Sequence, residues 1–70
     1  MSVYRVIDVI GTSTKSWEDA AKTAVTTAKG SLRDLRVAEV VKQDLDIGDD
    51  DTITFRVKLQ LSFKYEGGPA

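Results

Sequence analysis

The chain has 70 residues, carries a formal net charge of −1, and contains neither Cys nor His. A chain this short forms one domain that buries only about 60 % of its surface, and without Cys or His it has no disulfide, no thiolate or imidazole metal site and no base that titrates near neutral pH. The near-neutral charge disfavours a nucleic-acid binder, and no apolar stretch approaches the ~20 residues of a membrane span.

The first half of the chain predicts a strand followed by a helix. Residues 4–10 (YRVIDVI) are rich in β-branched side chains, and both faces of this strand are mainly apolar. Ser16 is a good helix N-cap, and Asp19 three residues later is close to a capping-box arrangement. Apolar residues, mostly alanine, then recur at helical spacing past Gly30, so we expect the helix to end at residues 32–35.

The second half predicts two strands joined by an acidic turn. Residues 37–45 (VAEVVKQDL) form the first of them, and residues 46–51 turn the chain. Residues 52–66 alternate apolar and polar side chains seven times in succession, which is typical of a strand. Residues 1–66 are therefore expected to form a single domain, and residues 67–70 (GGPA) a flexible C-terminal tail.

These elements predict an α+β fold of the βαββ type, with a three-stranded antiparallel sheet packed on one helix. The last two strands form a hairpin, and a right-handed helical crossover makes the first two strands parallel. The last strand then most simply lies between the other two, antiparallel to both. The helix covers one face of the sheet.

The apolar surface of this fold exceeds what a single helix can cover. The last strand extends about 46 Å, whereas the helix extends about 30 Å. Soluble proteins avoid exposing the remainder, so we expect a homo-oligomer in which Leu59, Leu61 or Phe63 lies in a subunit contact. The alternative is a curled sheet that wraps its own helix.

Four segments of the chain resemble the dodecin family. They are VIDVIGTS (residues 6–13), SWEDAA (16–21), LRDL (32–35) and the alternating FRVKLQLSFK (55–64), and the match covers nearly all of residues 3–66. The resemblance implies a βαββ fold assembled into a hollow spherical homododecamer that binds and stores a small ligand. In flavin-binding members, pairs of stacked flavins lie between subunits.

Two positions decide whether the flavin function carries over. Val37 stands where flavin-binding dodecins have a stacking tryptophan, and Arg56 stands where they have a glutamine at the isoalloxazine edge. A valine offers packing area but no π face, so weak or absent binding of riboflavin or flavin mononucleotide (FMN) is expected at these candidate ligand residues. The chain is more similar to a branch of the family that lacks this tryptophan and includes calcium dodecins. The resemblance thus implies calcium, without indicating its ligands.

Carboxylates are the candidate metal ligands. Asp44 and Asp46 begin an acidic segment that continues to residue 51, and Asp8 lies inside the first strand. Calcium prefers six to eight hard oxygen ligands, which several copies can supply around a symmetry axis. We therefore predict Asp8, Asp44 and Asp46 as ligands. The segment does not match an EF-hand, and the alternatives are a solvated hairpin loop and a salt bridge from Asp8.

A basic set could form a charged face of the sheet, either as ordinary solvent-facing positions or to hold an anion such as a flavin phosphate. Its members are Arg5, Arg36, Lys42, Arg56, Lys58 and Lys64.

The sequence contains no catalytic motif, so we expect no enzymatic activity. The leading hypothesis, which the resemblance implies, is a calcium-binding storage dodecamer. We expect it in the cytoplasm, because the first residues do not resemble a signal peptide. The alternatives are a flavin-storage dodecin with a weakened pocket and a purely structural oligomeric module.

Overall fold

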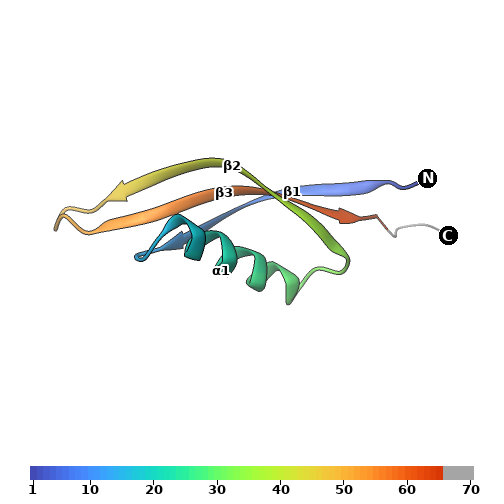
Figure 1. Ribbon diagram of the computed structural model, residues 1–70, viewed down its shortest axis with the longest axis horizontal. Coiled ribbons are helices and arrows are strands. Elements are labelled where there is room, and N and C mark those ends of the chain that lie inside the picture. Colours follow the sequence, from blue (N-terminus) through green and yellow to red (C-terminus); the bar gives the residue numbers. More distant parts are fainter. Residues whose placement is uncertain (66–70) are drawn as a thin grey trace.

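The computed structural model describes residues 1–65, which form three strands and one helix. Their order is β1 (Tyr4–Ser13), α1 (Trp17–Lys29), β2 (Leu35–Ile47) and β3 (Ile53–Lys64). The sheet order is β1-β3-β2, with β3 antiparallel to both neighbours, and α1 lies against one face of the sheet (Figure 1). The predicted βαββ fold is confirmed. The predicted C-terminal tail lies outside the described residues.

The helix begins where the sequence predicts it, but it ends earlier. The hydroxyl of Ser16 accepts a 2.9 Å hydrogen bond from the backbone N–H of Asp19. The Asp19 carboxylate accepts from the hydroxyl of Ser13 at 2.6 Å, which fastens the end of β1 to the helix. The last helical residue is Lys29 and Gly30 is the C-cap, so the predicted end at residues 32–35 is wrong. The apolar periodicity extends further because Leu32 still packs against the core after the helix has ended.

A close contact between β1 and α1 explains the alanine-rich face of the helix. A Cβ atom added at Gly11 would lie 2.3 Å from the carbonyl oxygen of Ala20 and 2.9 Å from the Cβ of Ala24. Only glycine fits at this point of the strand, and only small side chains allow the helix backbone to approach so closely. The helix therefore lies directly on β1 and β3.

The hydrophobic core beneath the helix is small. Among residues 1–65, the buried hydrophobic residues are Ala20, Val57, Leu59 and Leu61. Leu59 and Leu61, two of the three residues of which at least one is predicted in a subunit contact, are already buried within the single chain, and their contact with another copy stays a prediction. The helix covers the middle of β3, where both residues lie, and leaves other parts of the sheet bare.

Much apolar surface remains uncovered. The β2–β3 hairpin extends past the start of α1 as a thin arm (Figure 1), and the molecule measures 53 × 20 × 17 Å. Its radius of gyration is 14.5 Å, whereas a compact chain of this length has about 11 Å. Its accessible surface of 5166 Å² also exceeds the roughly 4,300 Å² of a typical folded monomer of this mass. The exposed large hydrophobic residues of the strands include Val6, Ile10, Val37, Val40, Val41, Leu45, Ile47 and Ile53.

Candidate functional site

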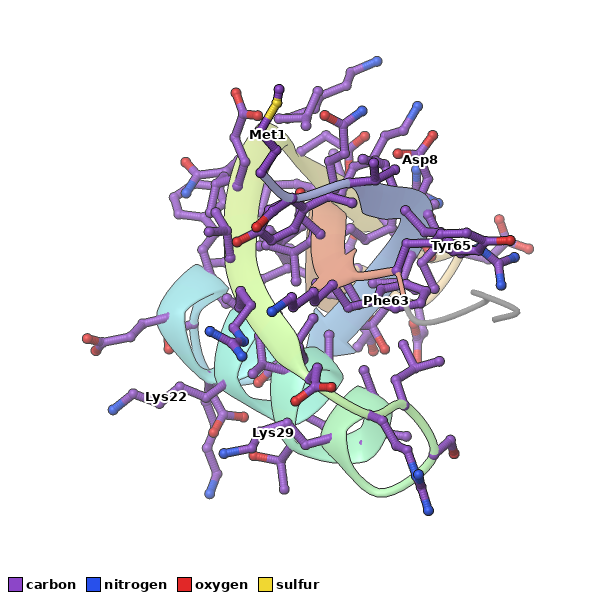
Figure 2. The ribbon with its side chains drawn as sticks, turned by 90° about the vertical axis from the view of Figure 1, so that its right-hand side faces the viewer. Met1, Asp8, Lys22, Lys29, Phe63 and Tyr65 are labelled. Carbon is purple, nitrogen blue, oxygen red and sulfur yellow. The ribbon has the colours of Figure 1, made fainter. Side chains whose placement is uncertain are left out.

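The face of the sheet that points away from α1, the open face, carries most of the charged strand residues. Side chains alternate between faces along each strand, and residues directly opposite each other on neighbouring strands share a face. Because Val57, Leu59 and Leu61 are buried under the helix, Arg56, Lys58, Gln60 and Ser62 belong to the open face. Figure 2 shows Asp8 on the other side of the sheet from Lys22 and Lys29 of α1.

The strand register arranges the open face in rows that run across the sheet. After a first pair, Tyr4–Lys64, the rows in the order β1, β3, β2 are Val6–Ser62–Val37, Asp8–Gln60–Glu39, Ile10–Lys58–Lys42 and Thr12–Arg56–Asp44. A last pair, Thr54–Asp46, lies nearest the hairpin arm. An acidic row therefore lies directly beside a basic one.

Both the backbone carbonyl and the side-chain carboxylate of Asp44 accept hydrogen bonds from other elements. Its carboxylate accepts hydrogen bonds from Nε and Nη2 of Arg56, at 2.8 and 3.3 Å. These hydrogen bonds lower the pKa of the Asp44 carboxyl. Its backbone carbonyl accepts a 3.0 Å hydrogen bond from Nε1 of Trp17, whose ring meets Phe55 edge-on at a centroid distance of 5.2 Å. Asp44 thus connects the helix start with both strands of the hairpin.

The three predicted metal ligands do not meet within one chain. Asp44 and Asp46 are two residues apart on the open face of β2, while Asp8 lies on the other edge strand. The row of Asp8 is about 13 Å along the strands from the row of Asp44. Among residues 1–65, no group of three or more acidic side chains lies close enough to share a metal ion. Of the three, Asp44 is committed to Arg56.

The acidic loop between β2 and β3 forms the hairpin turn, and its own hydrogen bonds stabilise it. The Oδ1 atom of Asp50 accepts a 3.1 Å hydrogen bond from the backbone N–H of Thr52, and the backbone N–H of Asp51 donates to the carbonyl of Gly48 at 3.0 Å. Hydrogen bonds from the side chain and backbone of Thr52 lower the pKa of Asp50. Asp51 adopts a left-handed conformation with φ of 66°, which aspartate tolerates better than most residues.

The two predicted ligand-binding residues, Val37 and Arg56, are also separated. Val37 lies opposite Ser62, six residues along β3 from Arg56, or about 20 Å. Val37 is 55 % exposed on the open face, and Val6 lies in the same row. One copy of the chain therefore presents an apolar position and a cation at different ends of the open face.

The pairing of Lys42 with Lys58 was not foreseen, although both residues belong to the predicted basic set. A register shift between Val40 and Lys42 makes Val41 an extra residue of β2, and this β-bulge places Lys42 opposite Lys58. The break in alternation at the adjacent valines 40 and 41 was the only signal of it in the sequence.

Comparison with known proteins identifies the family. The family model described as Dodecin matches residues 3–66. The calcium dodecin of Mycobacterium tuberculosis (strain ATCC 25618 / H37Rv) is 55 % identical over 64 residues, which are 91 % of this chain and 90 % of the relative. A crystal structure of the M. tuberculosis calcium dodecin, described as a calcium-chelating immunodominant antigen with a novel calcium-binding site, matches with a TM-score of 0.86 and 49 % identity, covering 99 % of each chain. The dodecin of Streptomyces coelicolor matches with a TM-score of 0.84 and 37 % identity, covering 93 % of each chain. The chain belongs to the dodecin family.

Proposed function

We propose that this protein is a non-enzymatic storage dodecin that assembles into a hollow homododecamer and binds calcium through carboxylates contributed by several subunits. The observation that carries the proposal is the incompleteness of the single chain. Its apolar surface is largely uncovered, and its open-face carboxylates are too dispersed to hold an ion. Assembly around symmetry axes remedies both deficiencies.

The apolar surface supports the assembly. A groove of about 340 Å³ lies between α1 and β2, and its apolar walls include Val25, Val40 and Leu59. The helix packs mainly over β1 and β3 and touches β2 little, so this groove has no cover within residues 1–65. A second copy that fills it removes apolar surface from water, which stabilises the assembly by roughly 25 cal/mol per Å².

The carboxylates support calcium. Asp8 and Asp46 are exposed on the open face, and within residues 1–65 neither forms a salt bridge. Calcium needs six to eight oxygen ligands, more than one copy provides, so the same residue from symmetry-related copies would share the ion. The absence of Cys and His favours hard cations over zinc or copper. The similarity to a protein described as a calcium dodecin agrees with this choice.

Calcium binding can be tested by thermal melting of the assembled protein, with calcium compared with sodium at equal ionic strength. Calcium should raise the melting temperature of the wild type because it relieves repulsion between carboxylates. Asp46→Asn and Asp8→Asn should reduce this shift, whereas the control Asp49→Asn in the hairpin loop should retain it. An equal shift with sodium, which indicates general screening, or no shift at all would contradict calcium binding.

Assembly is tested separately by gel filtration with light scattering. Val40→Asp places a charge in the apolar groove and should give smaller species, while Thr26→Asp at the solvent-facing rim of the same groove should disturb assembly less. A stable monomer of the wild type would contradict the proposed dodecamer.

Flavin storage is the second candidate, favoured by the exposed apolar row of Val6 and Val37 on the open face. A yellow purified protein with tightly quenched flavin fluorescence would support this candidate. A colourless assembly without a calcium response would leave a structural role.

The dodecin family suits binding rather than catalysis, and we place the protein in the cytoplasm. No helix of residues 1–65 is long and apolar enough to cross a membrane.

A further inference from the structure

Two lysines face each other on the open face. Lys42 of β2 and Lys58 of β3 are directly opposite in the antiparallel register, and both are exposed. The Cβ atoms of such a pair are about 4.5–5.5 Å apart, and like charges at these positions destabilise a sheet. Because the lysine pair by itself destabilises the sheet, we expect another group to compensate its positive charge.

The pairing depends on a local irregularity of β2. In a regular register, Val41 would follow Val40 and occupy the position opposite Lys58. The β-bulge skips Val41 and brings Lys42 to this position instead. Bulges of this kind re-aim side chains next to functional sites, so the second ammonium group is placed here by a specific feature of the backbone.

Within residues 1–65, no carboxylate forms a salt bridge with either lysine. The acids nearest in register are Asp8 and Glu39, both in the adjacent row on one side, and Asp44 on the other side, which is engaged by Arg56. Arg56 uses Nε and Nη2 for Asp44, so the two N–H groups of Nη1 have no hydrogen-bond partner among the described residues. Of the groups that line the pocket described next, three are cationic and one, Asp44, is a carboxylate.

These groups surround one small pocket. It has a volume of about 220 Å³ and is lined by Ile10, Lys42, Asp44, Arg56 and Lys58. Pockets for whole drug-sized ligands are typically about 300–1,000 Å³, so this pocket suits a small group rather than a complete ligand. Ile10 supplies an apolar wall on one side, and the cations supply donors on the other.

We propose that this pocket is an oxyanion site that binds phosphate or the phosphate group of a small phosphate monoester. The ammonium groups of Lys42 and Lys58 and the Nη1 group of Arg56 donate hydrogen bonds to its oxygens, and the negative charge removes the repulsion between the lysines. The site is distinct from Asp8 and Asp46, the calcium ligands tested above, because neither of them lines the pocket. Its existence does not depend on calcium binding.

The first test is isothermal titration calorimetry of the assembled protein in calcium-free buffer, with inorganic phosphate, ribose 5-phosphate and ribose as probes. Both phosphates should bind and ribose should not. Lys42→Gln and Lys58→Gln should each weaken binding by about tenfold or more, as expected when a hydrogen bond between charged groups is lost. Lys29→Gln removes the same charge from α1, on the other side of the sheet (Figure 2), and should bind like the wild type.

The second test separates an anion site from a merely structural role. In chloride, Lys58→Gln should melt at a higher temperature than the wild type, because the repulsion with Lys42 is gone. Replacing chloride by phosphate at equal ionic strength should raise the melting temperature of the wild type and leave that of Lys58→Gln nearly unchanged.

Three results would overturn the proposal. The first is wild-type protein that binds neither phosphate, and the second is binding that survives both lysine substitutions. The third is a change of oligomer size in Lys58→Gln without phosphate binding by the wild type, which would show that a carboxylate of another copy fills the pocket.

Discussion

Trp17 and Asp44 are 27 residues apart in the sequence and are joined by a 3.0 Å hydrogen bond from the indole Nε1 to the backbone carbonyl. The bond ties the first residue of α1 to β2, on which the helix otherwise packs little. The side chain of the same Asp44 is held by Arg56 of β3. The helix start and the base of the hairpin arm are therefore fixed relative to each other by one residue.

Trp17→Phe should destabilise the protein by about 0.5–1.5 kcal/mol, the usual contribution of a hydrogen bond. The phenyl ring can still pack edge-on against Phe55, so only the bond to Asp44 is lost outright. Urea denaturation followed by circular dichroism measures the difference. Trp17→Ala, which also removes the ring, should cost more than Trp17→Phe but less than the roughly 3–5 kcal/mol of a fully buried aromatic residue, because Trp17 is only partly buried. Equal stability of Trp17→Phe and the wild type would show that the bond contributes nothing.

Gly11→Ala should destabilise the protein by about 1–3 kcal/mol or more. The added methyl group would collide with the backbone oxygen of Ala20 and the side chain of Ala24, so the helix must move off β1. Gly30→Ala is the matched control. Gly30 has an ordinary right-handed conformation with φ of −70°, and an added Cβ would meet only the Thr27 carbonyl oxygen, at 3.3 Å. Thermal melts should rank Gly11→Ala well below Gly30→Ala, and the reverse order would contradict the close contact.

Acid should weaken the link between Asp44 and Arg56. Because the hydrogen bonds from Arg56 lower the pKa of Asp44 below its ordinary 3.8, their stabilisation is complete above that value. It is lost as the pH falls through the lower pKa of the folded protein. The melting temperature of the wild type should therefore fall more steeply below about pH 4 than that of Asp44→Asn. Asp50, whose pKa is also lowered, contributes its slope in both proteins. Parallel profiles would contradict the prediction.

Val37→Trp should strengthen flavin binding. Val37 is exposed on the open face, where a tryptophan ring could stack on an isoalloxazine from a neighbouring copy. Aromatic stacking of this kind contributes about 1–3 kcal/mol, so the dissociation constant for riboflavin or FMN should fall by about tenfold or more. Fluorescence quenching measures it, with Val41→Trp at the bulge as the positional control. An identical gain in both variants would indicate nonspecific stacking.

The sequence alone predicted the order of the elements and the start of the helix, and it limits the side chains that could bind a metal. The alternation of residues 52–66 predicts the strand and its two faces, because neighbours two positions apart in one strand always share a face. Ser16 marks the helix start because the cap acts within three residues of itself. The lack of Cys and His leaves only oxygen ligands for a metal.

Only the tertiary structure decided which of these residues lie together. The register between strands depends on pairing over long separations, and the bulge at Val41 shifts it by one residue. The adjacent valines 40 and 41 break the alternation, but they do not indicate which residues of β3 they face. This shift places Lys42 against Lys58, while the register separates Val37 from Arg56 and gives Arg56 to Asp44. The position of the helix likewise covers Leu59 and Leu61 and leaves Val40 open, because Gly11 admits α1 over β1 rather than over β2.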